Sequence, residues 1–493
     1  MTLRGTRISV PPIGRSGIGW GVALAATGLM AYGIMGTAAD RGTVDGLALA
    51  LGIGALAVVV LRPGLGGIAL PVLIFANAGL VLADNYGAPN VVSALAFLAL
   101  AAMMISPTWR ERALQTTPVL LAFVAYIGIR VISAVQAPGP ADAAKVLEDG
   151  LIGLAIVLVI TAVASTQDGL RHTAEVIAIC AAGLAALTIV KQVGVGGTWF
   201  GFATDNPPTA EQIAASGRAG FRIGGDQSRA TGPLADANFW AQALVLAFPL
   251  ALWSIRRSPT ALGRWLAVGA AALILTGVLL TQSRGGAMAL IVAASVWLWF
   301  QGGRYRLGLV ILPVAVVIGV SVTGNTSRFE QLSQLRDPSA STDFKGRLSE
   351  NIAAFEMWKD NPVLGVGANE FPSNYRAYAA DIGLDARAER NAHNSYLQAA
   401  AETGTVGFLA FAAMIVTALW CGLRARGRLL ADDEVDTAGV AEALIAGFVG
   451  YLVAAVLLHQ AYPQYLWAWA ALLAGCLLLS GYRMRRLLPG GEA

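Results

Sequence analysis

The chain has 493 residues, of which 56% are hydrophobic and only 13% are charged, and its mean hydropathy is +0.63. Soluble domains carry about 25% charged residues, so this composition excludes an ordinary soluble protein. The net charge of +4 does not indicate a nucleic-acid partner, because the cations collect at the ends of apolar runs rather than along one basic face. These properties predict an all-α polytopic membrane protein embedded in a lipid bilayer.

About fourteen membrane-spanning helices are predicted from the apolar runs. The run at 17–36 is longer than the apolar region of a signal peptide, so it is interpreted as the first span. The first seven spans are expected near 17–36, 46–61, 67–83, 91–106, 118–136, 150–165 and 173–192. The second seven are expected near 236–253, 265–281, 286–300, 307–322, 404–423, 439–458 and 465–482.

The distribution of arginine and lysine predicts the orientation of these spans. Cationic segments such as 109–112, 254–264, 424–428 and 483–486 are assigned to the cytoplasm, whereas the short outer loops hold few cations. An even number of spans then places both termini in the cytoplasm. Two long segments, 193–235 and 323–403, are expected on the outer face, and loops of this length in compact proteins are commonly functional.

The second long segment is expected to form a small helical domain. Apolar residues recur in it at helical spacing, and Asn-Pro and Gly signals close the helix; these residues are Leu348, Ile352, Phe355, Met357 and Trp358. The chain is therefore divided into an N-terminal transmembrane bundle (1–192), a transmembrane core with the first long loop (193–322), the helical loop (323–403) and C-terminal transmembrane helices (404–493).

Cysteine usage gives no sign of a disulfide framework or of a metal site. Cys180, Cys421 and Cys476 all lie within apolar runs, and no metal-ligand spacing is present. We therefore expect neither a metal nor another cofactor.

Three positions on the expected outer face carry groups suited to chemistry. Arg229 precedes a Gly-Pro turn and an apolar helix that Asp236 or Asn238 could cap. Arg284 lies in a Ser-Arg-Gly-Gly turn between two spans, where glycine lets a ligand approach the backbone closely. His393 precedes the sequence SYLQ (395–398), which has the form of a capping box.

These groups match the requirements of glycosyl transfer from a lipid diphosphate. Guanidinium groups make paired hydrogen bonds to phosphate oxygens, and a helix N-terminus adds about half a positive charge. The same field favours a neutral imidazole, the form in which His393 accepts a proton. Taken alone, each residue has an ordinary structural interpretation: a contact with solvent or lipid headgroups for the arginines, and a surface or capping role for His393.

Further candidates are less specific. Arg218 and Arg222, in a Gly-rich stretch, could bind phosphate or be unremarkable loop residues. Arg130 lies within an expected span, where a charge is costly unless it is functional or reaches the interface. Glu402 could steady the His393 loop or serve as a second base. His459, near aromatic residues, is interpreted as structural rather than functional.

Four segments occur in order between residues 220 and 425: RATGPLADANFWA, LTQSRGG, NPVLGVGANEF and NAHNSYLQAAAETGTVGF. The set resembles the O-antigen ligase and Wzy-type O-antigen polymerase superfamily. This resemblance implies a GT-C-like enzyme of the bacterial inner membrane that acts at the periplasmic face on undecaprenyl-diphosphate-linked glycans and needs no metal. The Asp-Ala-Asn at 236–238, where relatives commonly have Asp-Pro-Asn, removes a rigid turn but no chemical group.

The resemblance also implies that Arg229, Arg284 and His393 are the essential residues. Asn394, next to His393, is a candidate substrate-binding residue. Arg222 is the alternative to Arg229 as the first arginine of the set.

The leading hypothesis is an inverting ligase that transfers a lipid-linked glycan onto an acceptor hydroxyl, on lipid A core or a similar glycolipid or glycan. A polymerase that joins lipid-linked repeat units uses the same chemistry and remains open, as does transfer onto a protein hydroxyl. A lipid-linked glycan flippase is the alternative from another class. It is disfavoured because the spans, apart from the one with Arg130, are nearly free of charge. A purely structural scaffold would leave the arginine-rich loops unexplained.

Overall fold

The computed structural model describes residues 59–86, 90–137, 140–192, 229–234, 236–303, 306, 342–381, 391–459 and 462–482. Within these ranges every regular element is a helix. In the first half these are α3 (Pro63–Phe75), α4 (Ala78–Tyr86), α5 (Val91–Ile105), α6 (Pro107–Ala113), α7 (Pro118–Gln136), α8 (Pro140–Ala164) and α9 (Gln167–Gln192). They continue with η1 (Gly232–Leu234), α11 (Ala237–Arg257), α12 (Ala261–Leu280), α13 (Arg284–Gln301), α16 (Thr342–Asp360), α17 (Phe371–Asp381), α18 (Ser395–Ala431), α19 (Val435–Ala454), η4 (Ala455–Leu457) and α20 (Pro463–Leu479).

Seven of the described helices are long and apolar enough to cross a membrane: α7, α8, α9, α11, α12, α18 and α19. Shorter apolar helices, α3, α5 and α20, accompany them. The all-helical, multi-pass prediction is therefore confirmed. The spans expected near 17–36 and 307–322, and most of the one near 46–61, lie outside the described residues, so the count of fourteen stays a prediction.

One expected span is wrong. The run at 67–83 is divided into α3 and α4 by Asn77, whose backbone adopts a positive φ of 50°. The buried Asn77 side chain donates a hydrogen bond to the Pro233 carbonyl at 3.0 Å. This long-range contact satisfies a buried polar group and stabilises a turn that the apolar pattern does not reveal.

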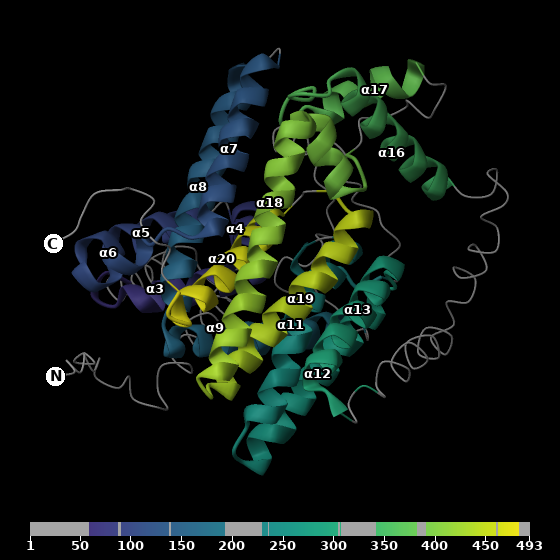
Figure 1. Cartoon of the computed structure of the whole chain (residues 1–493). Helices are drawn as coiled ribbons and strands as arrows, with labels where there is room; N and C mark the ends of the chain where they lie inside the picture. The colour runs from purple at the N-terminus through teal and green to yellow at the C-terminus, as the bar shows by residue number, and fades with distance from the viewer. Residues whose placement is uncertain are drawn as a thin grey trace, which may run out of the picture.

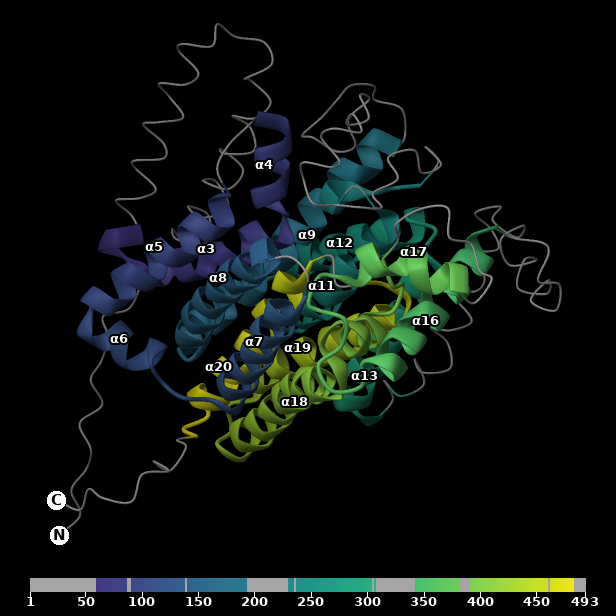
Figure 2. The ribbon, with the colours of Figure 1, turned by 90° about the horizontal axis from the view of Figure 1, so that it is seen from above.

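Helix α11 lies at the centre of the bundle and packs against α9, α12, α13 and α19 (Figure 1). Its approach to α19 is close because α19 carries glycine at the crossing: a Cβ on Gly447 would lie 2.4 Å from the Leu246 carbonyl oxygen. Small residues at such crossings let membrane helices pack backbone against backbone. Viewed from above, α3, α5 and α6 lie on one side of the bundle, and α12, α16 and α17 lie on the other (Figure 2).

Ion pairs mark one end of the bundle. Asp436, at the start of α19, pairs with Arg171 at 3.1 Å and with Arg257, at the end of α11, at 3.3 Å. Arg426 of α18 pairs with Glu442 of α19 at 2.8 Å. The cationic segments 254–264 and 424–428 therefore lie at the same end, as the proposed topology requires. The assignment of this end to the cytoplasm stays a prediction.

Helices α16 and α17 form the small helical unit expected in the second long segment, and they lie together beside one end of α18 (Figure 1). Helix α16 ends at Asp360, just before the Asn-Pro signal. Two of the apolar residues that predicted this helix, Leu348 and Phe355, are 47% and 48% exposed. The unit instead has its own small core, formed by Ala353, Ala354, Met357, Phe371, Tyr375, Ala379, Ala392 and Ala401. The four-part division of the chain stays a prediction.

The turn after α16 docks on a break within α18. Gly404 has non-helical angles there, with φ 63° and ψ −168°. The Thr405 amide donates to the Pro362 carbonyl at 2.8 Å, and the Val366 amide donates to the Ala401 carbonyl at 2.9 Å. These backbone bonds join the NPVLGVG and AETGT motifs and fix the α16–α17 unit on the bundle.

Candidate functional site

His393 lies immediately before α18, and Asn394 caps that helix. The Asn394 side chain accepts hydrogen bonds from the backbone amides of Tyr396 and Leu397, at 3.0 and 3.1 Å. A cap of this type satisfies amides that have no partner within the helix. His393 therefore occupies the position predicted for it, just ahead of a helix N-terminus, while Asn394 has a structural task in addition to any contact with substrate.

The capping box expected from SYLQ is wrong. Ser395 donates its hydroxyl to the Leu458 carbonyl at 2.6 Å, and Gln398 donates its side-chain amide to Glu402 at 2.9 Å. Both side chains are buried against other parts of the fold, and a buried polar group bonds to whichever partner the packing provides.

The ring of His393 is held by a carboxylate. Its Nδ1 lies 2.5 Å from a carboxylate oxygen of Glu350, which is on α16. Glu350 is fully buried at 0% exposure, whereas the His393 side chain is 31% exposed. A buried carboxylate that accepts the Nδ1 proton leaves Nε2 as the nitrogen able to take up a proton. This arrangement orients a histidine as a general base.

Glu350 is a functional candidate that the sequence pattern did not reveal, although a signal was present. It lies three, four and seven residues before Ala353, Ala354 and Met357, all of which are 0% exposed. That spacing puts the four residues on one face of α16. A carboxylate on the buried face of a helix needs a hydrogen-bond donor, and the His393 ring supplies one to Glu350.

Arg229 connects the start of α11 with the turn before α13. Its Nε donates to the Thr281 carbonyl at 2.9 Å, and a terminal nitrogen donates to the Asn238 side-chain oxygen at 3.0 Å. Asp236 caps α11 by accepting from the amides of Asn238 and Phe239, which confirms one of the two predicted caps. The guanidinium is therefore positioned by two elements that are distant in sequence.

Arg284 is the first residue of α13 and is exposed. Ser283 caps the helix by accepting from the Gly286 amide at 3.1 Å. A Cβ on Gly285 would lie 3.0 Å from Leu457 of η4, and Gly286 is buried against α11. The two glycines thus serve close helix packing, which fixes the turn that presents Arg284.

Residues 457–459 connect these parts. Leu457 lies against Gly285 at the start of α13. The Leu458 carbonyl accepts a hydrogen bond from the Ser395 hydroxyl at the start of α18. The ring of His459 lies 5.7 Å from the ring of His393 and 4.9 Å from that of Phe239 on α11, measured between centroids. The starts of α11, α13 and α18 therefore meet at one end of the bundle.

Arg229, Arg284 and His393 are thus brought to the same end. The N-termini of α13 and α18 add their partial positive charge to the two guanidinium groups, whereas the Asp236 carboxylate that caps α11 offsets the charge of that helix end. The resulting field suits an anion such as a diphosphate. The ion pairs of Arg257 and Arg426 lie at the opposite ends of α11 and α18, so the two ends of the bundle differ in chemistry.

Residues 269–412 match the family model described as O-antigen ligase. The resemblance drawn from the sequence is confirmed. The matched segment of this O-antigen ligase family includes Arg284, Glu350 and His393, whereas Arg229 and Arg130 precede it. No curated protein matches the chain. The match supports a function of the O-antigen ligase or polymerase type in a multi-pass membrane protein, and members of the family are glycosyltransferase-like enzymes.

Arg130 and Glu402 hold the α16–α17 unit against the bundle. Arg130, 7% exposed on α7, donates to the Asn369 side chain at 2.7 Å. The backbone amides of Asn369 and Phe371 donate to the Glu402 carboxylate. The Ser133 hydroxyl donates to the Glu402 carbonyl at 2.7 Å. The carboxylate bonded to His393 is that of Glu350 rather than Glu402, so the described contacts of Glu402 are structural.

Replacing Glu402 with alanine is expected to destabilise the protein by about 2–4 kcal/mol, because it leaves buried backbone amides without an acceptor. Glu402→Gln keeps one acceptor oxygen and is expected to cost about 1 kcal/mol. Thermal unfolding in detergent measures both. Glu148→Gln, at an exposed ion pair, is the control and is expected to change stability by less than about 0.5 kcal/mol. Equal stability of Glu402→Ala and the wild type would contradict this role.

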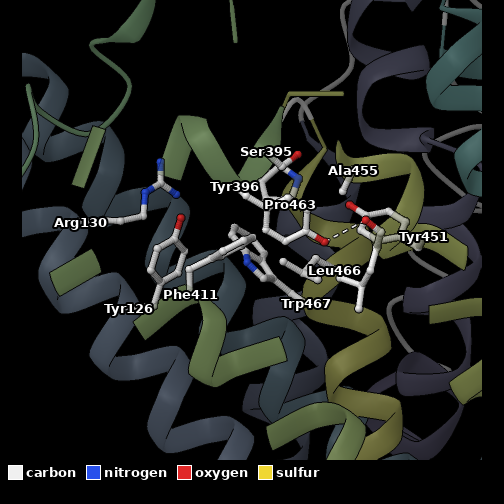
Figure 3. A pocket seen from close by; sticks show the side chains of 11 residues that line it. Tyr126, Arg130, Ser395, Tyr396, Phe411, Tyr451, Ala455, Pro463, Leu466 and Trp467 are labelled. Carbon is white, nitrogen blue, oxygen red and sulfur yellow. Dashed lines mark hydrogen bonds between the residues drawn. The ribbon is translucent and has the colours of Figure 1, made fainter. Parts of the chain in front are cut away.

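A pocket opens beside the start of α18 (Figure 3). Arg130 and Tyr126 lie at one end of it and Tyr451 at the other, with Tyr396 and Trp467 between them. The Tyr396 hydroxyl donates to the Leu452 carbonyl at 2.8 Å. The walls are mainly aromatic and aliphatic, and Arg130 contributes a guanidinium group. Two of the lining residues, Ser395 and Tyr396, follow His393 closely in the sequence.

Two predicted phosphate ligands, Arg218 and Arg222, lie outside the described residues, so the choice between Arg222 and Arg229 stays open. Among the described residues, no cluster of three or more His, Cys, Asp or Glu side chains could hold a metal ion. The three cysteines are unbonded.

Proposed function

We propose that this chain is an inverting glycan transferase. It moves an undecaprenyl-diphosphate-linked glycan onto the hydroxyl of a lipid A core or similar acceptor, at the periplasmic face of the inner membrane. The observation that carries the proposal is the His393–Glu350 pair at the end of the bundle that also holds Arg229 and Arg284.

In this proposal the two arginines bind the donor. Arg229 is already oriented by Thr281 and Asn238, so its guanidinium loses little freedom when it meets a phosphate oxygen. Arg284 is exposed at a helix N-terminus, where a diphosphate can reach both its side chain and the local field. Positive charge placed where the leaving diphosphate develops negative charge stabilises the transition state, and the proposal invokes no metal ion.

His393 acts on the acceptor. As the acceptor oxygen attacks the anomeric carbon, Nε2 of His393 takes the hydroxyl proton and Glu350 stabilises the imidazolium that forms. The bond from the anomeric carbon to the diphosphate breaks, and its electron pair leaves with undecaprenyl diphosphate. Attack opposite the leaving group inverts the configuration at that carbon.

Arg130 and the pocket of Figure 3 suit the lipid end of the donor. The walls of the pocket are mainly apolar, as an isoprenyl chain is, and Arg130 supplies the guanidinium among the residues that line it. Arg218, Arg222 and Asn394 stay candidates for further contacts with substrate.

The test uses purified full-length protein in proteoliposomes with a lipid-linked glycan donor and a lipid A core acceptor. The proposal predicts glycan covalently attached to the acceptor. Lengthening of the donor glycan without acceptor attachment would instead indicate a polymerase, which uses the same side chains. Transfer of intact donor between leaflets with neither product would overturn the proposal in favour of a flippase.

Glu350→Gln is expected to lower kcat at least about tenfold, because a neutral amide can donate as well as accept, so it no longer selects the Nδ1-protonated tautomer, and it carries no charge to stabilise the imidazolium. Steady-state transfer at saturating donor and acceptor measures this. Glu356→Gln, on the same helix in a surface pair with Lys359, is the matched control and is expected to leave kcat unchanged. An unaltered kcat in Glu350→Gln would remove Glu350 from the mechanism.

A further inference from the structure

His459 occupies the loop between η4 and α20, beside two residues of the proposed site. Its ring meets those of His393 and Phe239 edge to face, with centroids 5.7 and 4.9 Å away. Phe239 follows Asn238, which accepts a hydrogen bond from Arg229. His459 therefore lies between the proposed base and the helix that positions the proposed phosphate ligand.

The Nδ1 atom of His459 is buried and has no hydrogen-bond partner within the part of the chain that the structure describes. A buried polar atom without a partner costs about 1–3 kcal/mol, so proteins rarely leave one unsatisfied. Six other buried side-chain atoms among the described residues also lack a partner, and His459 differs from them in that its ring lies against the proposed base His393.

The chemistry of His459 restricts which substrate groups can form a hydrogen bond with its Nδ1 atom. Burial and the neighbouring His393 lower the pKa of His459 to about 3. The ring is therefore neutral, which suits it to an uncharged group rather than to a phosphate. Nδ1 donates or accepts according to the tautomer, and a hydroxyl satisfies either form. Sugars present such hydroxyls around the reacting carbon and the attacking oxygen.

We propose that His459 is a substrate-binding residue whose Nδ1 exchanges a hydrogen bond with a sugar hydroxyl next to the reacting atoms. This inference rests on the proposed glycan transfer and names one further contact within it. The edge-to-face contacts with Phe239 and His393 orient the ring. A site built to bond a hydroxyl also discriminates against sugars that lack it, which makes His459 a specificity determinant.

Three substitutions test the contact. His459→Phe keeps an aromatic ring of similar size and removes the hydrogen bond. His459→Asn places an amide near the position of Nδ1, whereas His459→Gln places one nearer to Nε2. Each full-length variant is assayed for transfer with the acceptor titrated at saturating donor, and with the donor titrated at saturating acceptor. Thermal unfolding in detergent is measured in parallel, and His172→Phe, in the first turns of α9, is the control for replacing a histidine.

His459→Phe is expected to lower kcat/KM about tenfold, as the loss of one hydrogen bond to an uncharged group does. His459→Asn is expected to restore most of this loss, and His459→Gln to restore less. A rise in KM for the acceptor assigns the hydroxyl to the acceptor sugar, and a rise in KM for the donor assigns it to the donor sugar.

The inference is overturned if His459→Phe keeps the wild-type kcat/KM for both substrates. It is also overturned if all three variants lose activity equally and in step with a lower unfolding temperature, which would indicate a packing role alone. The proposed function is judged separately, from transfer by the wild type and its loss in His393→Ala. Absence of transfer by the wild type would overturn both.

Discussion

His393→Ala is expected to abolish detectable glycan transfer, with kcat reduced about 10²- to 10⁴-fold, because it removes the proposed base. Arg284→Ala is expected to reduce kcat about 10²- to 10³-fold, because charge on the leaving diphosphate is then less stabilised. The measurement is initial transfer rates in proteoliposomes, normalised to inserted protein. Both side chains lie at the surface or are partly exposed, so both variants are expected to insert. Because His393→Ala also takes the imidazole partner from the buried Glu350 carboxylate, thermal unfolding in detergent is measured in parallel.

The controls separate geometry from charge. Arg284→Lys is expected to stay at least about tenfold impaired, since an ammonium does not make the planar two-point contact of a guanidinium. Arg264→Ala removes an exposed arginine from the start of α12 and is expected to transfer at the wild-type rate. Near-wild-type transfer by Arg284→Ala or His393→Ala would show that the assigned role of that residue is wrong.

Gly404→Ala is expected to destabilise the docking of the α16–α17 unit by at least about 3 kcal/mol and to lose transfer with it. The φ and ψ of Gly404 fall in a region that essentially only glycine occupies, at a cost of about 1–3 kcal/mol for other residues. In addition, an added Cβ would lie 2.2 Å from the Val363 carbonyl oxygen, and that backbone is itself hydrogen-bonded to α18. Glu350 lies on the displaced unit, so the His393 pair would be broken at the same time.

Thermal unfolding in detergent and limited proteolysis between α16 and α17 measure this effect. Gly427→Ala is the matched control within α18, because no atom lies within 4 Å of its added Cβ. Alanine there is expected to stabilise the helix slightly, by up to about 1 kcal/mol. If Gly404→Ala showed the protease resistance and activity of Gly427→Ala, the break in α18 would not be what fixes the unit.

Local features of the sequence determined the elements. Apolar runs predicted the helices, with α7 found at the predicted 118–136 and α16 ending just before its Asn-Pro signal. The cap of α11 by Asp236 and the place of His393 ahead of α18 followed from residue types within a few positions. The ordered motifs also indicated the family, which the match of residues 269–412 supports.

The same local rules failed where distant segments compete for a polar group. Ser395 has the form of a helix cap, but the Leu458 carbonyl takes its hydroxyl and Asn394 caps instead. Asn77 interrupts an apolar run because Pro233, far along the chain, accepts its amide. Such outcomes depend on which carbonyls the packing brings near, and spacing along the chain does not encode this.

The sequence by itself determined that this protein is a helical membrane protein with cationic and imidazole groups of the glycan-transferase kind, since hydrophobic length and residue chemistry are local properties. Only the tertiary structure decided that Glu350, 43 positions away, pairs with His393, and that His459 lies against the same ring. A buried carboxylate must find its partner among whatever the packed helices place beside it. That partner is set by the docking of α16 on α18, which long-range backbone bonds and two close-packed glycines, Gly365 and Gly404, hold in place.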